Sequence, residues 1–355
     1  MLKEDLKSSL VSISNQKIRN TPIVIYDVKL IDVIVKDFYD AITLLPNSKL
    51  YFAMKANSNK DILKYLSTRI DGVDVASSKE LELALNFFSA KNLSINGPAF
   101  SVEEIRNISK RGMMYDFNSL TQIELVGIKE DSISVRVKIG ESRFGIDIFE
   151  AKFKKYCTRN TLKIGKIHVH SETKDNLFIH QLEEIFLELD KGGMLKHIKQ
   201  INLGGGFLEL VLNNQLIDFF EKLSKVYKKF DIRVETIIEP GQALIMLSAY
   251  LITKIIDVDC INDIQKIVVN TSAYNLFSWS RPVIIANSSK NTNSLKTIVY
   301  GETCFEEDIM CEEKIMPEVK VNDFLIFYPI GAYSQSNHNC LHLLDFPEEI
   351  LINEL

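Results

Sequence analysis

One cationic side chain stands in an otherwise apolar stretch of the segment YFAMKANSNKDILKYL, residues 51–66. Lys55 follows the apolar run and precedes residues typical of a turn between a strand and a helix. Such a lysine can snorkel, with its aliphatic stem on apolar surface and its ammonium in water. A desolvated lysine amine is instead a nucleophile that can form a Schiff base. The rest of the chain decides between these interpretations.

Other side chains that could do chemistry stand at the ends of predicted strands. They are Asp74 in GVDVA, His168 and His170 in KIHVH, Gly204, Gly205 and Gly206 in LGGGF, and Glu239 before Pro240 and Gly241. Catalytic side chains of a parallel α/β barrel lie at the C-terminal ends of its strands. This repeated placement favours a functional interpretation of Lys55 over snorkelling.

The triple glycine of LGGGF, residues 203–207, lets backbone N–H groups approach an anion closely. The loops after the last two strands of such a barrel often bind phosphate, although a flexible turn is the alternative. A phosphate site facing Lys55 predicts a phosphorylated cofactor that forms imines, and pyridoxal 5′-phosphate fits. Its pyridine nitrogen needs an acidic partner, for which Glu239 is the candidate. The alternatives are a solvated carboxylate for Glu239 and a hydrogen-bonded core histidine for His170.

The elements that must position these residues alternate along the chain. Short β-branched runs are separated by amphipathic runs such as SKELELALNFF and DNLFIHQLEEIFLELDK, a pattern typical of βα units. This predicts an α/β fold, a (β/α)8 TIM-like barrel over residues 30–245 that binds the cofactor. A doubly wound open sheet is the alternative. The predicted strands are 49–54, 72–76, 93–97, 113–117, 132–139, 166–170, 200–204 and 234–239.

The pattern changes after residue 245. The runs AYLITKIIDVDC, QKIVVNTS, SLKTIVYG and DFLIFYPIGAY are rich in strand-forming residues, with no long helical pattern between them. They predict an all-β C-terminal domain over residues 246–355. The N-terminal segment, residues 1–29, contains the strand-like TPIVIYDV and could lead into the barrel or add to the β domain.

Composition excludes several classes of protein. The chain has 355 residues, 46% hydrophobic and 25% charged, and a net charge of −5, which is typical of a globular protein without a basic face for nucleic acid. The start, MLKEDLKSSLVSISNQ, lacks the apolar core of a secretory signal, and no segment is apolar enough for a membrane span. The five scattered cysteines indicate neither a disulfide framework nor a metal site. A reducing cytoplasm is the expected location.

The motifs YFAMKANSNKDIL, GVDVASSKELELAL, INGPAF, RFGID, IHVHSET, INLGGGF, EPGQAL, GETCFEED and GAY occur in this order between about residues 22 and 335. Together they resemble the fold-type III pyridoxal-phosphate decarboxylases. These are alanine-racemase-like barrel enzymes that act on diaminopimelate, ornithine, arginine, lysine and carboxynorspermidine.

The resemblance implies roles for individual residues. Lys55 would hold pyridoxal 5′-phosphate covalently, with Asp74 and Glu80 near that end of the site. His170 would stack on the pyridine ring, and Glu239 would pair with the ring nitrogen. The residues expected around the phosphate are Thr173, Gly205, Gly206, Gly241, Gln242 and Tyr333.

The C-terminal domain would complete the site. Cys304 resembles a residue that the partner subunit contributes as a proton donor, so the resemblance implies a homodimer with shared active sites. The residues expected to contact the substrate are Arg281, Phe305, Glu306 and Asp308.

Three departures from the family pattern bear on the substrate and the phosphate. The segment HSET stands where relatives have H-x-G-S, and Gln242 stands where many have arginine. Phe305 follows Cys304, where diaminopimelate enzymes have glutamate and ornithine enzymes have aspartate. These features predict decarboxylation of a carboxylated polyamine or an aminocarboxypropyl conjugate. Alternatives are a diaminopimelate- or ornithine-type decarboxylase, an amino-acid racemase, which Glu239 disfavours, and an inactive regulatory relative.

Overall fold

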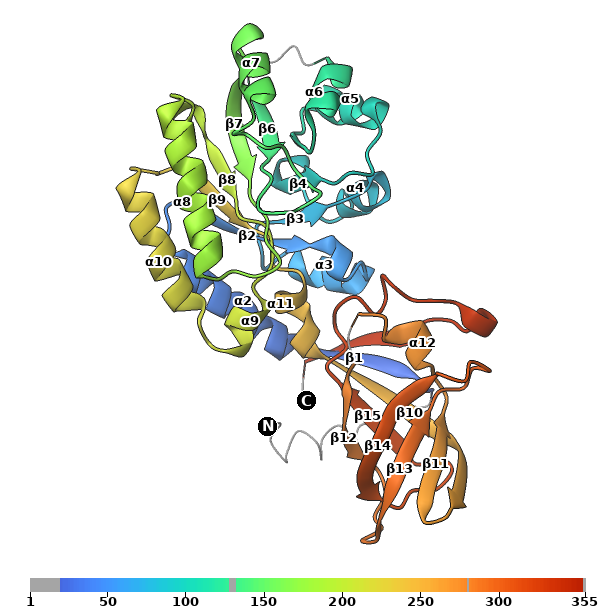
Figure 1. Ribbon diagram of the computed structural model, residues 1–355. Coiled ribbons are helices and arrows are strands. Elements are labelled where there is room, and N and C mark those ends of the chain that lie inside the picture. Colours follow the sequence, from blue (N-terminus) through green and yellow to red (C-terminus); the bar gives the residue numbers. More distant parts are fainter. Residues whose placement is uncertain (1–19, 128–131, 280, 354–355) are drawn as a thin grey trace. The chain divides into compact units, whose positions relative to one another are not determined.

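The computed structural model describes residues 20–127, 132–279 and 281–353, which form two compact units (Figure 1). One unit runs from Val33 to Leu244. The other combines the described residues up to Asp32 with those from Ile245 onward. Residues 1–19 of the predicted N-terminal segment lie outside the described residues.

The first unit is a closed barrel of parallel strands in the order β2 to β9. Closure is made by β2 and β9, where Leu50 pairs with Ile238. The predicted (β/α)8 barrel is therefore confirmed, and the alternative of an open sheet is wrong. The strands are β2 (Ser48–Ala53), β3 (Gly72–Val75), β4 (Leu93–Asn96), β5 (Tyr115–Phe117), β6 (Ser132–Arg136), β7 (Lys163–His168), β8 (Gln200–Asn202) and β9 (Glu235–Ile238).

Helices cover the outside of the barrel and start at capping side chains. Asn59, Ser77, Ser101, Ser119 and Asp175 each accept a hydrogen bond from a backbone N–H in the first turn of the next helix. Such caps satisfy N–H groups that would otherwise lack a partner. The helices are α2 (Val28–Ile42), α3 (Lys60–Leu66), α4 (Ser78–Ala84), α5 (Val102–Lys110), α6 (Leu120–Val126), α7 (Ala151–Arg159), α8 (Asn176–Lys191), α9 (Leu208–Leu212), α10 (Leu216–Lys229) and α11 (Gln242–Ile245).

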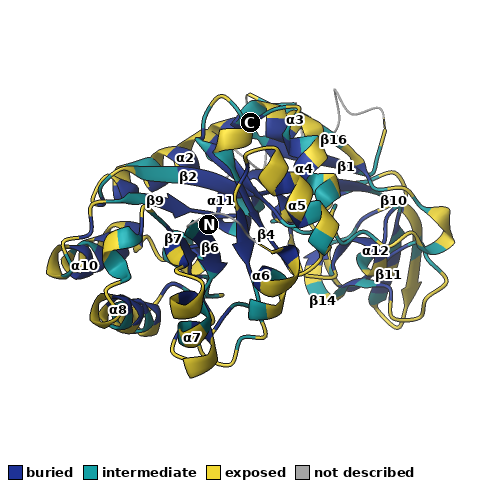
Figure 2. Cartoon of the chain, turned by 90° about the horizontal axis from the view of Figure 1, so that it is seen from above, coloured by how far each residue is buried: buried dark blue, intermediate teal, exposed yellow. Residues whose placement is uncertain are grey.

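The barrel core lies between the strands and the inner faces of these helices. Figure 2 shows the strands almost wholly buried and the helices exposed on their outer side. Aromatic rings fill the space between α8 and α10, where Phe186 and Tyr227 have ring centroids 5.9 Å apart. Burial of such rings is a large part of what stabilises a fold of this kind.

The second unit is built on an eight-stranded sheet, which confirms the predicted β-rich C-terminal domain. Its core includes Ile25, Tyr250, Ile252 and Ile326. The early strand β1 (Ile23–Asp27) belongs to this sheet, where it pairs with β10 and β16. The other elements are β10 (Ala249–Ile261), β11 (Ile264–Val269), α12 (Ala273–Leu276), β12 (Val283–Asn287), β13 (Ser294–Tyr300), β14 (Ile309–Pro317), β15 (Phe324–Tyr328) and β16 (Glu348–Ile352).

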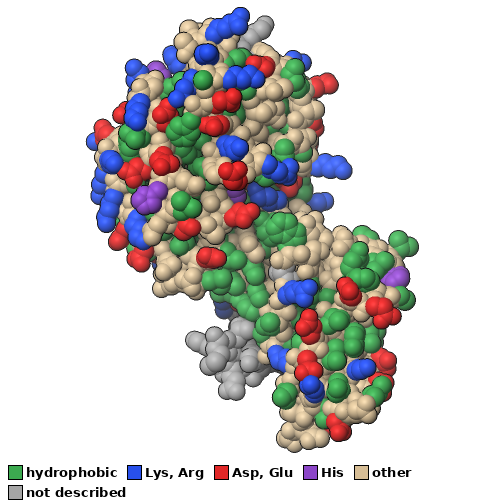
Figure 3. Space-filling model, in the orientation of Figure 1, with side chains coloured by type: hydrophobic (Ala, Val, Ile, Leu, Met, Phe, Trp, Pro, Cys, Tyr) green, Lys and Arg blue, Asp and Glu red, His purple; other side chains and the backbone are tan. Residues whose placement is uncertain are grey.

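Charged side chains of both signs are interspersed over the face of the barrel shown in Figure 3. Some form exposed pairs, as Arg111 does with Glu82 at 2.7 Å. No helix within the described ranges combines the length and the apolar character needed to cross a membrane.

Candidate active site

Lys55 lies in a short 3-10 turn, Met54–Ala56, directly after β2. Both neighbours are fully buried, whereas the Lys55 side chain is 44% exposed. Its Nζ lies 3.1 Å from Oδ2 of Asp74, a buried carboxylate on β3. Lys55 therefore does more than snorkel, because it forms an ion pair inside the barrel while its amine stays accessible.

The carboxylate of Asp74 is held from two sides. Asn96 Nδ2 donates to Oδ1, and Lys55 is bound at Oδ2. Burial and the charge of Glu239 raise the pKa of Asp74 to about 7, although Lys55 opposes this shift. Nearby, Glu80 accepts a hydrogen bond of 2.6 Å from the backbone N–H of Ala76. This fixes Glu80 at the start of α4, on the strand end next to Lys55.

Glu239 follows the last barrel strand and is only 2% exposed, so it is not a solvated loop carboxylate. Asn202 Nδ2 donates to its Oε1. Its Oε2 lies 3.6 Å from Nε2 of His168. The hydrogen bond from Asn202 therefore orients this carboxylate, whereas His168 lies beyond hydrogen-bond distance.

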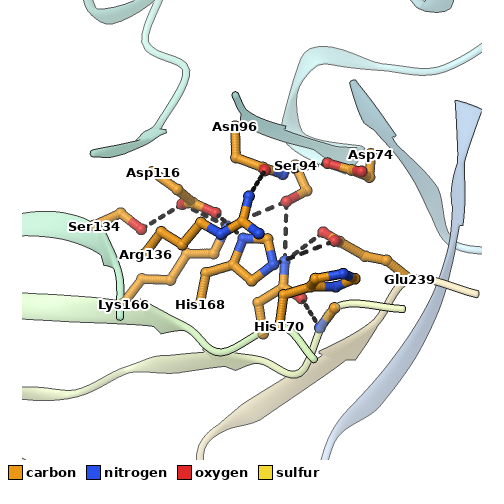
Figure 4. A network of polar contacts seen from close by, with 12 residues as sticks. Asp74, Ser94, Asn96, Asp116, Ser134, Arg136, Lys166, His168, His170 and Glu239 are labelled. Carbon is orange, nitrogen blue, oxygen red and sulfur yellow. Dashed lines mark hydrogen bonds and ion pairs between the residues drawn. The ribbon is translucent and has the colours of Figure 1, made fainter. Parts of the chain in front are cut away.

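A buried polar network joins these residues across the barrel (Figure 4). Its centre is Asp116 on β5, whose Oδ1 lies 3.0 Å from Lys166 Nζ and whose Oδ2 lies 3.0 Å from His168 Nδ1. Ser134 also donates to Asp116. Burial alone would raise the pKa of Asp116, but Lys166, His168 and Ser134 together hold it well below its usual value. Asp116 is therefore ionised at neutral pH.

His170 stands over the glycine turn that follows β8. The N–H of Gly205 donates to its Nδ1 at 3.1 Å. Burial, helped by the charges of Lys174 and Lys55, lowers the pKa of His170 well below its usual value, so the ring is neutral and can accept this bond. A Cβ on Gly204 would lie 2.5 Å from the same Nδ1, so only glycine allows the ring to approach the backbone here.

The other residues predicted at the phosphate lie in the segments that follow β7, β8 and β9. Gly206 has a φ of +91°, and a Cβ there would lie 2.3 Å from the carbonyl oxygen of Ser171 and 2.8 Å from that of Glu172. Thr173 Oγ1 donates to Asp175 at 3.4 Å. Gly241 packs closely against Ala53 and Ala56, and Gln242 begins α11.

The remaining predicted site residues belong to the second unit. Cys304 is exposed, and its N–H donates to Nε2 of His342 at 3.0 Å. The ring of Phe305 lies 5.0 Å from that of Tyr274. Arg281 and Glu306 are exposed, and Tyr333 stacks on Trp279 with ring centroids 5.0 Å apart.

Asp308 differs from these residues because it is only 2% exposed. It accepts hydrogen bonds from Tyr274 N at 3.1 Å and from Thr303 Oγ1 at 2.6 Å. These contacts stabilise the turns of its own unit. A role for Asp308 in substrate binding stays a prediction.

Sequence reasoning missed much of the polar interior of the barrel. Polar residues recur two positions apart within single strands, as in Ser94 and Asn96 or Lys166 and His168, and such residues face the same side of a strand. This spacing is a signal that could have revealed an inward polar face. The missed residues are Ser94, Asn96, Asp116, Ser134, Arg136, Lys166, Lys174 and Asn202.

The chain is similar to known proteins over most of its length. Residues 31–246 match the family model described as "Pyridoxal-dependent decarboxylase, pyridoxal binding domain". The chain is 24% identical to the 2-[(L-alanin-3-ylcarbamoyl)methyl]-2-hydroxybutanedioate decarboxylase of Staphylococcus aureus, over 84% of this chain and 86% of that protein. It is 26% identical to the diaminopimelate decarboxylase of Buchnera aphidicola, over 94% and 89% of the two chains.

Solved structures share the fold. The arginine decarboxylase of Paramecium bursaria Chlorella virus, bound to agmatine, has a TM-score of 0.83 at 16% identity. The match covers 98% of this chain and 100% of that chain. The diaminopimelate decarboxylase of Helicobacter pylori, complexed with L-lysine, has a TM-score of 0.82 at 20% identity, covering 96% and 94% of the two chains. Because the family model spans more than half of the sequence, the chain belongs to the pyridoxal-dependent decarboxylases.

Proposed function

We propose that this chain uses pyridoxal 5′-phosphate to decarboxylate an amino acid with a long or bulky distal part. One observation carries this proposal. An exposed lysine, Lys55, and a buried carboxylate held by a hydrogen bond, Glu239, both lie at the C-terminal ends of barrel strands. Family membership supports the choice of cofactor.

The donors of the site fit this cofactor. Lys55 is the amine that would hold its carbonyl carbon. The flat ring of His170 lies beside the glycine turn, partly buried, where it would lie against the pyridine ring. Glu239 is the acid that would hold a proton on the ring nitrogen. The turn of Gly204 to Gly206 carries no side chain that could exclude a phosphate group. When bound, pyridoxal 5′-phosphate supplies the ring that accepts the electron pair released as CO2 leaves.

The chain's own residues prepare this chemistry in separate ways. Asp74 holds Lys55 Nζ at the strand end and can accept a proton from it. Asn202 fixes the Glu239 carboxylate before anything binds, and such preorganised charge is typically the largest source of catalysis. Cys304 is the proposed group that returns a proton to the substrate carbon, from the second unit of a partner subunit.

The preference for an extended substrate rests on Phe305 and on the relatives. Phe305 is 40% exposed and presents an apolar ring where a carboxylate would bind a distal ammonium. One relative is named for a substrate in which an L-alanine unit is joined through an amide to a hydroxybutanedioate. Such a conjugate combines a decarboxylatable amino-acid group with a large distal part.

Release of CO2 by the purified protein tests the proposal. Wild-type protein with pyridoxal 5′-phosphate is incubated with diaminopimelate, ornithine, arginine, carboxynorspermidine and amide-linked amino-acid conjugates. We expect CO2 from at least one extended substrate and none after Lys55→Ala. Lys60→Ala is the control, because Lys60 is exposed at the start of the adjacent α3 and lies outside the proposed site. Normal turnover by Lys55→Ala would contradict the proposed site.

A further inference from the structure

Lys174 is a buried lysine with no role in the site described so far. It lies between β7 and α8 and is only 3% exposed, whereas the adjacent Asp175 is exposed. Asp175 is the N-cap of α8 and accepts a hydrogen bond of 2.9 Å from Phe178 N. Lys174, the residue before this N-cap, therefore points its side chain into the protein and does not extend it to water.

The ammonium of Lys174 is poorly compensated for a buried charge. Its Nζ donates to the carbonyl oxygen of Ser171 at 3.3 Å and lies 4.0 Å from the ring centroid of Phe178 and 5.4 Å from that of Phe207. Within residues 20–127, 132–279 and 281–353, no carboxylate forms an ion pair with it. An ammonium has three donors, and an uncompensated buried charge is costly. Burial lowers the pKa of Lys174 to about 7, against the opposing charges of Glu239 and Asp175.

The surroundings of Lys174 place this charge beside the glycine turn. A Cβ on Gly206 would lie 2.3 Å from the oxygen of Ser171, the same carbonyl that accepts from Lys174. Phe207, which Lys174 faces, is the next residue along the chain. Lys174 also acts on the charge state of His170, which binds the N–H of Gly205. The loop that carries Lys174 therefore packs closely against the glycine turn.

Two N–H groups of the glycine turn are already bound within the chain. The N–H of Gly204 is bound to Asn202 Oδ1 at 2.8 Å, and the N–H of Gly205 is bound to His170. Gln242, at the start of α11, carries an uncharged amide, whereas arginine would carry a positive charge. A phosphate monoester carries up to two negative charges and needs a cation when it is removed from water.

We infer that Lys174 is the cation that binds the phosphate group of the cofactor at the Gly204–Gly206 turn. This inference rests on the proposed function and adds a residue that the family motifs did not indicate. The two N–H bonds of the ammonium that Ser171 leaves available would go to phosphate oxygens, which would compensate the buried charge.

The test compares pyridoxal 5′-phosphate with pyridoxal, which lacks the phosphate. Dissociation constants of both are measured by equilibrium dialysis for the wild-type apoprotein, Lys174→Met and Lys191→Met. Lys191 is an exposed lysine at the end of the same helix and serves as the control. We expect Lys174→Met to weaken pyridoxal 5′-phosphate binding roughly tenfold to a hundredfold, the usual effect of losing a charge-assisted hydrogen bond. Binding of pyridoxal should change less than about twofold.

Three outcomes would contradict either the role of Lys174 or the proposed function, and the measurements distinguish them. Unchanged binding of pyridoxal 5′-phosphate by Lys174→Met, or equal losses for both ligands, would overturn the role of Lys174. A wild-type protein that binds neither ligand would overturn the proposed function itself. Circular dichroism verifies folding, and Lys174→Gln replaces Lys174→Met in the same comparison if the methionine variant is unfolded. Lys174→Arg should restore at least part of the discrimination between the two ligands, because it restores the charge.

Discussion

Nε2 of His168 lies 3.6 Å from Oε2 of Glu239, while Nδ1 of the same ring lies 3.0 Å from Oδ2 of Asp116. Asp116 is ionised, so its Oδ2 accepts a hydrogen bond from the N–H at Nδ1. Burial lowers the pKa of His168, although Glu239 and Asp116 oppose the shift. A neutral ring that carries its proton on Nδ1 presents the lone pair of Nε2 to Glu239. Two unprotonated groups repel each other, so the contact between Nε2 and the carboxylate is attractive only when one of them carries a proton. Asp116 therefore fixes which ring nitrogen of His168 carries the proton, and with it whether His168 attracts or repels the Glu239 carboxylate.

Replacing Glu239 by glutamine should leave the cofactor bound and slow decarboxylation. An amide keeps the shape of the side chain but cannot hold a proton on the ring nitrogen. Loss of one preorganised electrostatic contact typically lowers kcat by about 10²–10³. The measurements are kcat and the dissociation constant of pyridoxal 5′-phosphate. Glu235→Gln is the matched control, because Glu235 begins the strand that Glu239 follows and pairs with Lys49 at 2.6 Å. A wild-type kcat for Glu239→Gln would mean that the ring nitrogen is not used.

Replacing Asp116 by asparagine should destabilise the barrel strongly. Asp116 and Lys166 are 0% and 3% exposed, so the substitution leaves a buried ammonium without its carboxylate. Removing one partner of a buried ion pair costs about 3–5 kcal/mol, whereas an exposed pair contributes about 0–1 kcal/mol. The free energy of unfolding of the apoprotein is measured by urea denaturation. Glu82→Gln, which breaks the exposed pair with Arg111, is the control. Equal effects of the two substitutions would contradict a structural role for the Asp116 pair.

The barrel and its strand ends could be predicted because each strand is a short β-branched run between amphipathic helices. The predicted strand at 72–76 corresponds to β3 at Gly72–Val75, and Lys55 and Glu239 follow β2 and β9 as expected. The burial of Lys174 could not be predicted in this way. A lysine in the polar loop HSETKD is typical of exposed surface. Only tertiary packing against Phe178 of α8 and Phe207, the residue before α9, removes it from water.

The burial of Lys174 predicts a pH-dependent stability of the apoprotein. Its pKa is lowered from 10.5 to about 7 in the folded state, so the unfolded chain binds more protons between these values. The free energy of unfolding should therefore rise with pH over this interval, since the penalty for burying the ammonium is full below about pH 7 and absent above about pH 10.5. Lys174→Met removes this contribution. Urea denaturation of both apoproteins at several pH values measures the difference between them, with Lys191→Met as the control. A difference that is constant with pH would contradict the prediction.

Shared active sites predict recovery of activity when two inactive variants are mixed. Lys55 belongs to the barrel unit and Cys304 to the β-rich unit. If a two-fold homodimer brings Cys304 to the partner's site, one site of a mixed dimer is intact. Equimolar Lys55→Ala and Cys304→Ala protein should then recover roughly a quarter of wild-type activity after subunit exchange. Mass spectrometry of isotopically labelled subunits verifies the exchange. Absence of recovery despite demonstrated exchange would contradict shared sites.

The substrate prediction concerns Phe305, whose ring packs on Tyr274 in its own unit and remains 40% exposed. A carboxylate at this position could pair with a distal ammonium, at about 1.5–3 kcal/mol for a charge-assisted hydrogen bond. An aromatic ring attracts a cation more weakly, by about 0.5–2 kcal/mol, and offers apolar area to a longer substrate. We therefore expect a lower kcat/KM for ornithine and diaminopimelate than for an amide-linked amino-acid conjugate or a carboxylated polyamine.

Substitution of the same residue makes this expectation testable within one protein. Phe305→Glu should raise kcat/KM for diaminopimelate or ornithine relative to the extended substrate by roughly tenfold, because it restores a partner for the distal ammonium. Phe305→Leu is the control, since it keeps an apolar side chain without adding charge. The adjacent Glu306 is exposed and could supply the same charge, so Glu306→Gln is measured in the wild-type background. A wild-type preference for ornithine or diaminopimelate that survives Glu306→Gln would refute the argument from Phe305.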